Sequence, residues 1–157
     1  MVLSAGSQKM QVTSNISLGA LTHSVEQNSK LMKEQMSYLK TFVLEEYSKG
    51  NYVVVGADWN MCPPNFDCQD YEADESIPVM QMNIDENIFP KDWQWVFDET
   101  HSTNRKMAAP YKKGETFTTL IDFYLVSPNI SVLNVETINQ DFKYSDHHPV
   151  KLKIQLK

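Results

Sequence analysis

The stretch YVVVGADWN, Tyr52 to Asn60, is the one around which the predicted fold is organised. A run of apolar β-forming residues leads into Gly56, so the sequence predicts a strand that is buried on both faces and turns sharply at the glycine. Asp58 and Asn60 follow at the carboxyl end of this strand, where active-site side chains are often held. Ordinary turns carry the same short pattern, so this segment alone leaves a structural and a functional role open.

Composition limits the classes to which the chain can belong. It has 157 residues, 41% of them hydrophobic, and we expect one domain over residues 1–157. The sequence shows neither an apolar run of membrane-spanning length nor a recognisable secretion signal at residues 1–10, and localisation stays open. The net charge of -6 disfavours a broad electrostatic grip on nucleic acid.

Two local features each leave two interpretations open. A basic cluster precedes the strand that carries Asp122, and it comprises Arg105, Lys106, Lys112 and Lys113. This cluster is either a solvated loop or a positive rim for a phosphate-bearing substrate. Cys62 and Cys68 lie close together in one loop, as a small disulfide or as two reduced thiols. Two cysteines imply neither a zinc framework nor a disulfide scaffold.

The first third of the chain predicts a β-hairpin and a helix. Residues 1–18 alternate as two strands with a turn at 6–9, and residues 20–28 form a polar connection. Residues 29–48 then show apolar positions at helical spacing, and Lys49 and Gly50 end the predicted helix. This apolar stripe is typical of core packing, and it consists of Met32, Met36, Leu39, Val43 and Tyr47.

The remainder predicts further strands joined by a long irregular stretch, 61–116. Its acidic first part lacks the spacing of a calcium-binding EF-hand loop and indicates a surface loop, whereas the alternating Trp93, Trp95 and Phe97 indicate a short strand. Residues 116–126 predict one strand filled on both faces. A turn at 128–129, a strand over 131–138 and a final strand from Val150 with clean alternation follow.

Polar residues at the ends of these strands form a candidate site. Asp122 interrupts an apolar run, where an unpaired carboxylate would cost several kcal/mol, so we expect it to have a partner. Asp146 and His147 stand in a loop just before the final strand. A carboxylate that holds a histidine fixes its tautomer, and further carboxylates suit a hard cation with oxygen ligands.

Three segments, GADWN at 56–60, TTLIDFYLV at 118–126 and YSDHHPV at 144–150, together resemble the endonuclease/exonuclease/phosphatase superfamily. These are metal-dependent phosphodiesterases and phosphatases related to DNase I, abasic-site endonucleases, sphingomyelinases and inositol-phosphate phosphatases. The resemblance implies an α/β (α+β) fold, part of a DNase I-like two-sheet sandwich of mostly antiparallel strands with flanking helices. It covers most of the chain.

The resemblance also implies a role for each matching residue. Asp58 would orient and activate the attacking water, Asn60 would contact the phosphate, and Asp146 would help to hold Mg²⁺ or Mn²⁺. His147 would hydrogen-bond a phosphoryl oxygen, with Asp122 as its orienting partner. From the basic cluster we expect Arg105 to contact the substrate. His148 stands where the family varies and receives no role.

Two departures from the family pattern support an alternative. The family's asparagine on the first strand and its principal metal-binding glutamate would lie upstream of Met1, so we expect the chain to correspond to the carboxyl-terminal portion of such a domain. Ser17 stands where the family commonly has histidine. A truncated or degenerate domain without turnover is therefore the second hypothesis, and a nucleic-acid-binding module is disfavoured by charge.

The expected partners follow from these hypotheses. We expect a phosphoester substrate, with a small molecule or lipid head group favoured over long DNA because the chain is acidic. A half domain would leave apolar sheet surface uncovered, so association into a homo-oligomer or with a missing amino-terminal half is also expected.

Overall fold

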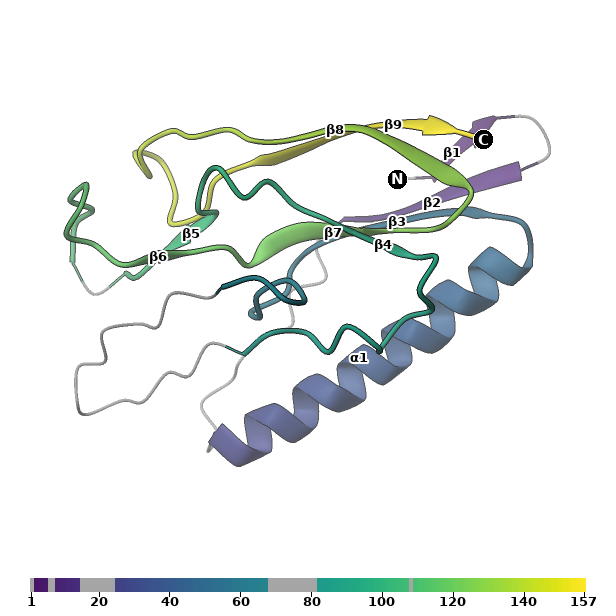
Figure 1. Cartoon of the computed structure of the whole chain (residues 1–157), viewed down its shortest axis with the longest axis horizontal. Coiled ribbons are helices and arrows are strands. Elements are labelled where there is room, and N and C mark those ends of the chain that lie inside the picture. Colours follow the sequence, from purple (N-terminus) through teal and green to yellow (C-terminus); the bar gives the residue numbers. More distant parts are fainter. Residues whose placement is uncertain (1, 6–7, 15–24, 68–81, 108) are drawn as a thin grey trace.

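The chain forms a mixed α/β fold of mostly antiparallel strands arranged in three layers (Figure 1). The computed structural model describes residues 2–5, 8–14, 25–67, 82–107 and 109–157. Within these ranges the elements are β1 (Val2–Ala5), β2 (Gln8–Ser14), α1 (Val25–Ser48), β3 (Tyr52–Asp58), β4 (Gln94–Val96), β5 (Asn104–Arg105), β6 (Thr118–Thr119), β7 (Asp122–Val126), β8 (Ile130–Thr137) and β9 (Val150–Leu156).

A five-stranded sheet with the order β1-β2-β3-β7-β4 is the middle layer. The pair β2–β3 is parallel and α1 connects the two strands, whereas β1–β2, β3–β7 and β4–β7 are antiparallel. Figure 1 shows α1 along one face of this sheet and the β8–β9 ribbon along the other. The short pair β5–β6 lies beyond the end of β7.

Each face of the sheet has its own core. Val53 and Val55 of β3 belong to the cluster that contains Met36, Leu39 and Val43 of α1. On the opposite face, a second cluster joins β3 and β7 to β8 and β9, and it includes Tyr52, Val54, Val126, Ile130, Leu152 and Ile154. The prediction that β3 is apolar on both faces is therefore confirmed, because a layer covers each side of it.

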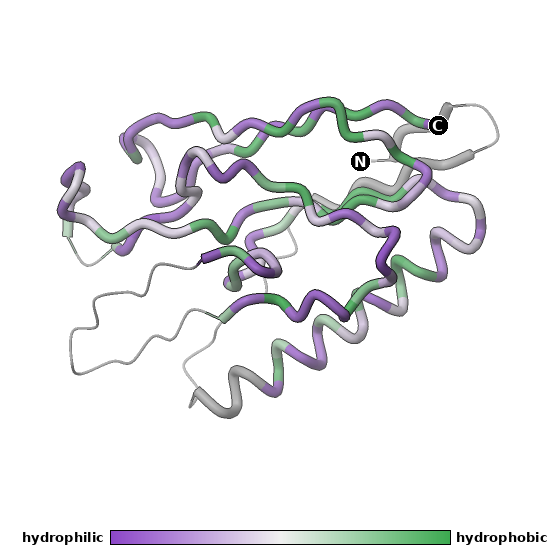
Figure 2. The backbone as a smooth tube through the Cα atoms, viewed as in Figure 1, coloured by the Kyte–Doolittle hydropathy of each residue, from purple (hydrophilic) through white to green (hydrophobic). Residues whose placement is uncertain are grey.

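Several predicted elements are found with shifted ends. The hairpin of β1 and β2 is confirmed, although β2 begins at Gln8, inside the predicted turn. The helix begins at Val25, so the predicted polar connection was too long. Its apolar stripe faces the sheet, and Gly50 ends it with a φ of 83°, the left-handed conformation that glycine tolerates. Along β9 the tube alternates in hydropathy, as predicted (Figure 2).

The irregular stretch contains more regular structure than the sequence predicts. The alternation around Trp95 does mark a strand, β4, with Trp95 packed on the α1 side and Val96 on the other. The strand β5 was not predicted. Cys62 is fully buried and disulfide-bonded, in agreement with the first of the two alternatives, while Cys68 and the acidic residues up to 81 lie outside the described residues.

The predicted turn at Gly56 is wrong. The strand β3 runs through this residue to Asp58, and the chain turns at Asn60, whose φ is 50°. Gly56 is paired with Tyr124 of β7, and a Cβ atom at position 56 would lie 2.6 Å from the Tyr124 ring. Glycine is required here because the Tyr124 ring packs directly against the backbone of β3, where a side chain at position 56 would collide with it.

The predicted single strand over residues 116–126 is divided. The structure has β6 and β7 with Leu120 and Ile121 between them, so Asp122 is the first residue of β7 and not the middle of a strand. The break changes the direction of the chain, and β6 pairs with β5 while β7 joins the main sheet. Among the described residues, the structure contains no helix that combines the length and apolar character needed to span a membrane.

Replacing Gly56 with Ala should destabilise the fold. The Tyr124 ring cannot easily move away, because its hydroxyl donates a hydrogen bond of 2.6 Å to the Val150 carbonyl. We expect a loss of about 1–3 kcal/mol in the free energy of unfolding, measured by urea denaturation. The matched control is the same change in a Tyr124→Leu background, where it should cost clearly less. Equal costs in the two backgrounds would contradict the steric explanation.

Candidate functional site

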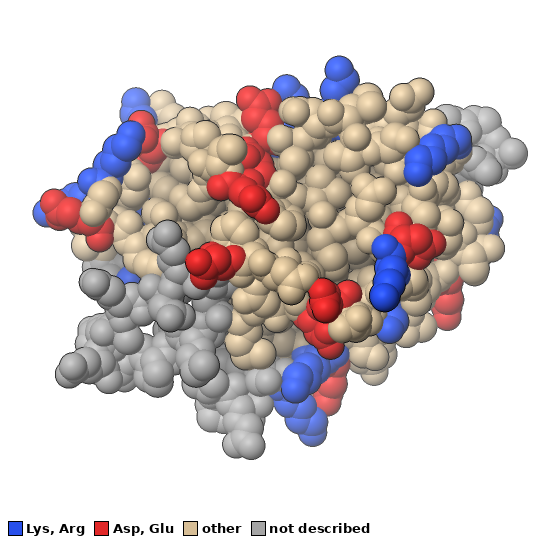
Figure 3. All heavy atoms as spheres, in the orientation of Figure 1, with Lys and Arg blue, Asp and Glu red and all other residues tan. Residues whose placement is uncertain are grey.

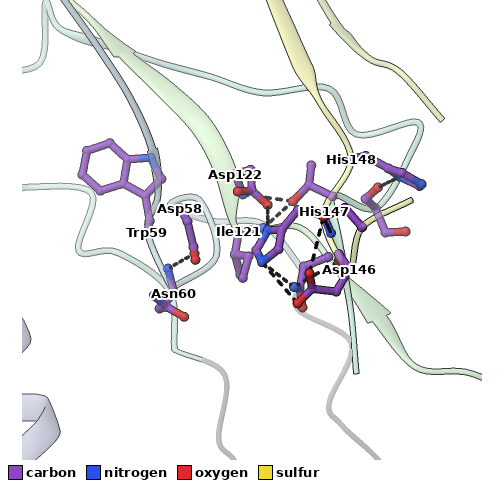
Figure 4. A network of polar contacts seen from close by, with 12 residues as sticks. Asp58, Trp59, Asn60, Ile121, Asp122, Asp146, His147 and His148 are labelled. Atoms are coloured by element: carbon purple, nitrogen blue, oxygen red, sulfur yellow. Dashed lines mark hydrogen bonds and ion pairs between the residues drawn. The ribbon is translucent and has the colours of Figure 1, made fainter. Parts of the chain in front are cut away.

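Two neighbouring strands and one loop bring the candidate residues together at one end of the sheet (Figure 4). Asp58, the last residue of β3, is the register partner of Asp122, the first residue of β7. Directly opposed residues of antiparallel strands place their side chains on the same face, so these two carboxyl groups are neighbours. The loop before β9 adds Asp146 and His147. The sequence-based prediction that these four residues converge is thus matched by their placement.

A carboxylate–imidazole pair is the central interaction of the site. His147 Nδ1 lies 2.8 Å from Asp122 Oδ2, a distance at which the ring N–H donates to the carboxylate. Asp122 therefore has the partner that its apolar surroundings require, and its side chain is 19% exposed. The bond fixes the ring orientation and leaves Nε2 as the imidazole nitrogen that faces the rest of the site.

Two groups surround His147 Nε2. The side-chain amide of Asn104 donates to it at 2.9 Å, and Asp146 Oδ2 lies 3.9 Å from it. Asn104 and His147 also form an isolated antiparallel bridge, so the backbone of β5 holds the histidine loop beside it. An amide donor at Nε2 fits the neutral ring with its proton on Nδ1, and rotation of the amide would present its oxygen to the protonated ring.

Electrostatics within the site favour a protonated histidine. The hydrogen bond that His147 donates to Asp122 raises the pKa of His147 above its ordinary value of 6.5. Burial opposes this increase, and the charges of Asp122, Asp58 and Asp146 add to it. The pKa of Asp58 is also raised, first because burial disfavours its charged form. The charges of Asp122 and Asp146 raise it further, while the Asn60 backbone N–H and His147 lower it.

Thr103, which the sequence analysis did not select, holds the two halves of the site together. Its hydroxyl oxygen accepts hydrogen bonds of 3.0 Å from the backbone N–H groups of both Ile121 and Asp122. These donors lie at the break between β6 and β7, where sheet pairing is interrupted. The carbonyl of Thr103 accepts a 2.7 Å hydrogen bond from the His148 N–H. Thr103 is 1% exposed, and no sequence pattern marked it, because its role depends on a strand break that the sequence did not predict.

His148 differs from its neighbour and has a structural position. It is 5% exposed, its ring stacks on Phe142 with centroids 3.7 Å apart, and it points away from His147 in Figure 4. Its Nδ1 lies 2.9 Å from the Ser102 carbonyl, and its Nε2 accepts the Phe142 backbone N–H at 3.1 Å. Both ring nitrogens are therefore satisfied within the fold.

Asn60 lies beside Asp58, and its expected contact with a phosphate stays a prediction. The backbone N–H of Asn60 donates to Asp58 Oδ1 at 3.0 Å (Figure 4). Between the two, Trp59 is fully buried and donates from Nε1 to the Phe123 carbonyl. The structure thus shows Asn60 orienting the Asp58 carboxylate through its backbone.

Arg105 lies in β5, and its expected contact with a substrate stays a prediction. Its guanidinium donates to the carbonyls of Lys106 and Ala109, at 3.2 and 3.3 Å, and so closes its own loop. Only its backbone N–H reaches the site, where it donates to the Asp146 carbonyl. The neighbouring positions of a strand point to opposite faces, so Asn104 faces His147 while Arg105 faces elsewhere. Ser17, the other position of interest, lies outside the described residues.

Carboxylate oxygens are suitable ligands for a hard cation, but the described residues of the site provide only part of a ligand set. Asp146 is suited to be one ligand: its side chain is 30% exposed, and its Oδ1 accepts one long contact of 3.4 Å from Ser145 Oγ. Within the described part of the chain, no three His, Cys, Asp or Glu side chains form a group that could hold a metal ion. Mg²⁺ commonly keeps water and substrate oxygens as its other ligands.

The chain has no match among protein-family models, and no curated protein matches it.

Replacing Thr103 with Val should weaken the fold around the site. The substitution keeps the shape but leaves the N–H groups of Ile121 and Asp122 without their acceptor. We expect a loss of about 2–4 kcal/mol in the free energy of unfolding. Thr137→Val is the matched control, because the Thr137 hydroxyl is buried and has no hydrogen-bond partner among the described residues, so its removal should be neutral or stabilising. Equal effects of the two substitutions would contradict the role of Thr103.

Replacing Asp122 with Asn should lower the pKa of His147, measured by NMR titration of the ring protons. Asp146→Asn should lower it less, since Asp146 contributes only a weaker charge effect. In the wild type the folded-state pKa lies above the unfolded value of 6.5, so the stabilisation is present below that pH and is lost as pH rises through the folded-state pKa. Wild type should therefore exceed Asp122→Asn in stability more at about pH 6 than at about pH 9. An unchanged His147 pKa in Asp122→Asn would overturn this assignment.

Proposed function

We propose that this chain is part of an endonuclease/exonuclease/phosphatase superfamily domain and that its site hydrolyses a phosphoester with the help of Mg²⁺ or Mn²⁺. The observation that supports the proposal most is the 2.8 Å pair of Asp122 and His147 beside the Asp58 carboxyl group. A protonated imidazole and a carboxylate at the same end of the sheet are the donor and the base that phosphoryl transfer to water requires.

Asp58 is the proposed base. Burial raises its pKa, so its carboxylate accepts a proton more readily than an exposed aspartate would. A water hydrogen-bonded to Asp58 attacks phosphorus, its proton passes to the carboxylate, and the bond from phosphorus to the leaving oxygen breaks. The Asn60 N–H, bound to Asp58 Oδ1, fixes the orientation of the base. The leaving oxygen takes its proton from solvent.

His147 is the proposed donor to a phosphoryl oxygen. Asp122 holds its Nδ1 and raises its pKa, so the ring remains protonated at a higher pH than a free histidine and offers Nε2–H to the oxygen that gains charge. In this state the Asn104 amide turns its oxygen toward the ring or moves aside, because a donor opposite Nε2–H would be repelled. Asp122 itself stays ionised and balances the imidazolium charge.

The proposed site also includes a divalent cation. Asp146 would hold Mg²⁺ or Mn²⁺, and the ion would supply positive charge that offsets the charge of the carboxylates and of the phosphate. Its remaining ligands would come from water, from the substrate or from a partner chain. Because the net charge is -6, we propose a small phosphoester or a lipid head group as substrate over long DNA.

A catalytically silent domain with the same fold, alone or as an oligomer, is the second candidate. It is favoured by the absence of a three-ligand metal group from the part of the chain that the structure describes. The two candidates differ in turnover, which is directly measurable.

Hydrolysis of bis-p-nitrophenyl phosphate, with Mg²⁺ and with EDTA, separates the candidates. We expect metal-dependent release of p-nitrophenol, and Asp58→Ala and His147→Ala should each reduce it about 100-fold or more. The matched controls are Asp92→Ala and His101→Ala, which remove exposed groups of the same chemistry and should leave the rate unchanged. No turnover by the wild type, or equal rates in the site variants and their controls, would reject the enzyme and support the silent domain.

A further inference from the structure

A cavity of about 730 Å³ opens beside the candidate site, in the loop that joins β5 and β6. Its lining combines cationic, aromatic and hydroxyl groups with one carboxylate, Glu115, which pairs with Lys112; the other polar and aromatic lining residues are Lys106, Tyr111, Thr116, Phe117 and Thr118. Such a mixture suits an anionic group carried on a small organic body. Figure 3 shows basic and acidic side chains side by side at the tip of this loop.

Two structural connections place the cavity next to His147. Lys106 is two residues beyond Asn104, whose amide contacts His147, and positions i and i+2 of an extended chain share a face at a spacing of about 7 Å. The pairing of β5 with β6 continues to Lys106, whose N–H donates to the Phe117 carbonyl at 3.1 Å. Lys106 therefore lies on the same face of the extended chain as Asn104, whose amide contacts the His147 imidazole.

The second connection passes through aromatic rings on the other side of the loop. Tyr111 packs edge to face against Phe142, with centroids 5.0 Å apart, and Phe142 stacks on His148. His148 is the chain neighbour of His147 and is fixed by its own hydrogen bonds. One wall of the cavity is thus packed against the loop that carries the imidazole.

Lys106 is the half-buried cation of the cavity lining, and it has no ion pair among the described residues. Lys113 has none there either, but it is exposed and does not line the cavity. Arg105 donates to carbonyl groups, and Lys112 pairs with Glu115 at 3.3 Å, both of them about 70% exposed. Lys106 is half-buried, and the structure shows no ion pair for it in the described residues. A half-buried ammonium group without a carboxylate favours an anionic ligand.

We propose that Lys106 and this cavity form a second anion-binding subsite, which receives an additional phosphate of the substrate whose scissile phosphoester lies at His147. The proposal rests on the proposed function and narrows the substrate to a class, small molecules that carry two phosphate groups. It also replaces Arg105 by Lys106 as the cation that the substrate meets. A second anion held by Lys106 would offset the repulsion from Asp58, Asp122 and Asp146.

Binding measured by isothermal titration calorimetry tests the subsite without requiring turnover. The probes are butane-1,4-diol bisphosphate and butane-1,4-diol monophosphate, each titrated into the wild-type chain with Mg²⁺ present. We expect the bisphosphate to bind about tenfold more tightly, the effect of one charge-assisted contact. Lys106→Met and Lys106→Gln should abolish the preference. Lys113→Met, which removes an exposed lysine that does not line the cavity, should retain it.

The outcomes separate this inference from the proposed function. A preference for the bisphosphate that disappears when Lys106 is replaced supports the subsite. If bis-p-nitrophenyl phosphate is not hydrolysed in the same protein, the catalytic proposal fails and an anion-binding site remains. Equal affinities for the two probes, binding of neither probe, or a preference that survives both Lys106 substitutions would overturn the subsite. Any of these results together with metal-dependent turnover would leave the catalytic proposal intact.

Discussion

The hydrogen bond between Asp122 and His147 imposes the strictest demand on this structure. A partly buried carboxylate is stable only with a partner, and the partner comes from a loop 25 residues away in the sequence. The first residue of β7 and the loop before β9 must therefore be held in a fixed relation. Thr103 provides this by accepting from the Asp122 N–H through its hydroxyl and from the His148 N–H through its carbonyl. One buried residue thus hydrogen-bonds to the backbone of both segments.

The layers beneath the site make its geometry rigid. Trp59, next to Asp58, is fully buried and packs against Phe123 and Trp95, with ring centroids 5.5 and 5.1 Å away. This aromatic group belongs to the core between the sheet and α1. Asp58 is the chain neighbour of a residue in this well-packed core, so its side chain has little conformational freedom and is held in place without a ligand. Preorganised charge of this kind is what stabilises a transition state at low cost.

The sequence predicted the parts of the fold that depend on periodicity and the site residues that depend on local anomalies. Alternation in β9 and the apolar stripe of α1 were recovered, and the isolated Asp122 in an apolar run pointed correctly to a partner. Gly56 was misinterpreted because a glycine that admits a ring looks, in sequence, like a glycine that permits a turn. Its partner Tyr124 is 68 positions distant, and only the strand pairing identifies it.

The residues that the sequence analysis missed act through the backbone or depend on the orientation of one strand. Thr103 and Asn104 carry no recognisable pattern, because their effect arises from a strand break and a bridge that are formed elsewhere in the chain. Arg105 was selected for its charge, but the pleat of β5 turns it away from the imidazole, and a one-residue difference in strand register decides such a case. A pattern of charges can point to a loop near a site, but the strand register decides which residue of that loop faces it.

The tautomer of His147 tests the central claim most directly. Long-range ¹H–¹⁵N correlation NMR at a pH above the His147 pKa, with the resonances assigned by comparison with His147→Gln, reports which ring nitrogen carries the proton. We expect the proton on Nδ1, donated to Asp122, with an unprotonated Nε2 facing Asn104. A ring protonated on Nε2 would contradict it, because Asp122 would then not hold the imidazole and Nε2 would not be available as described.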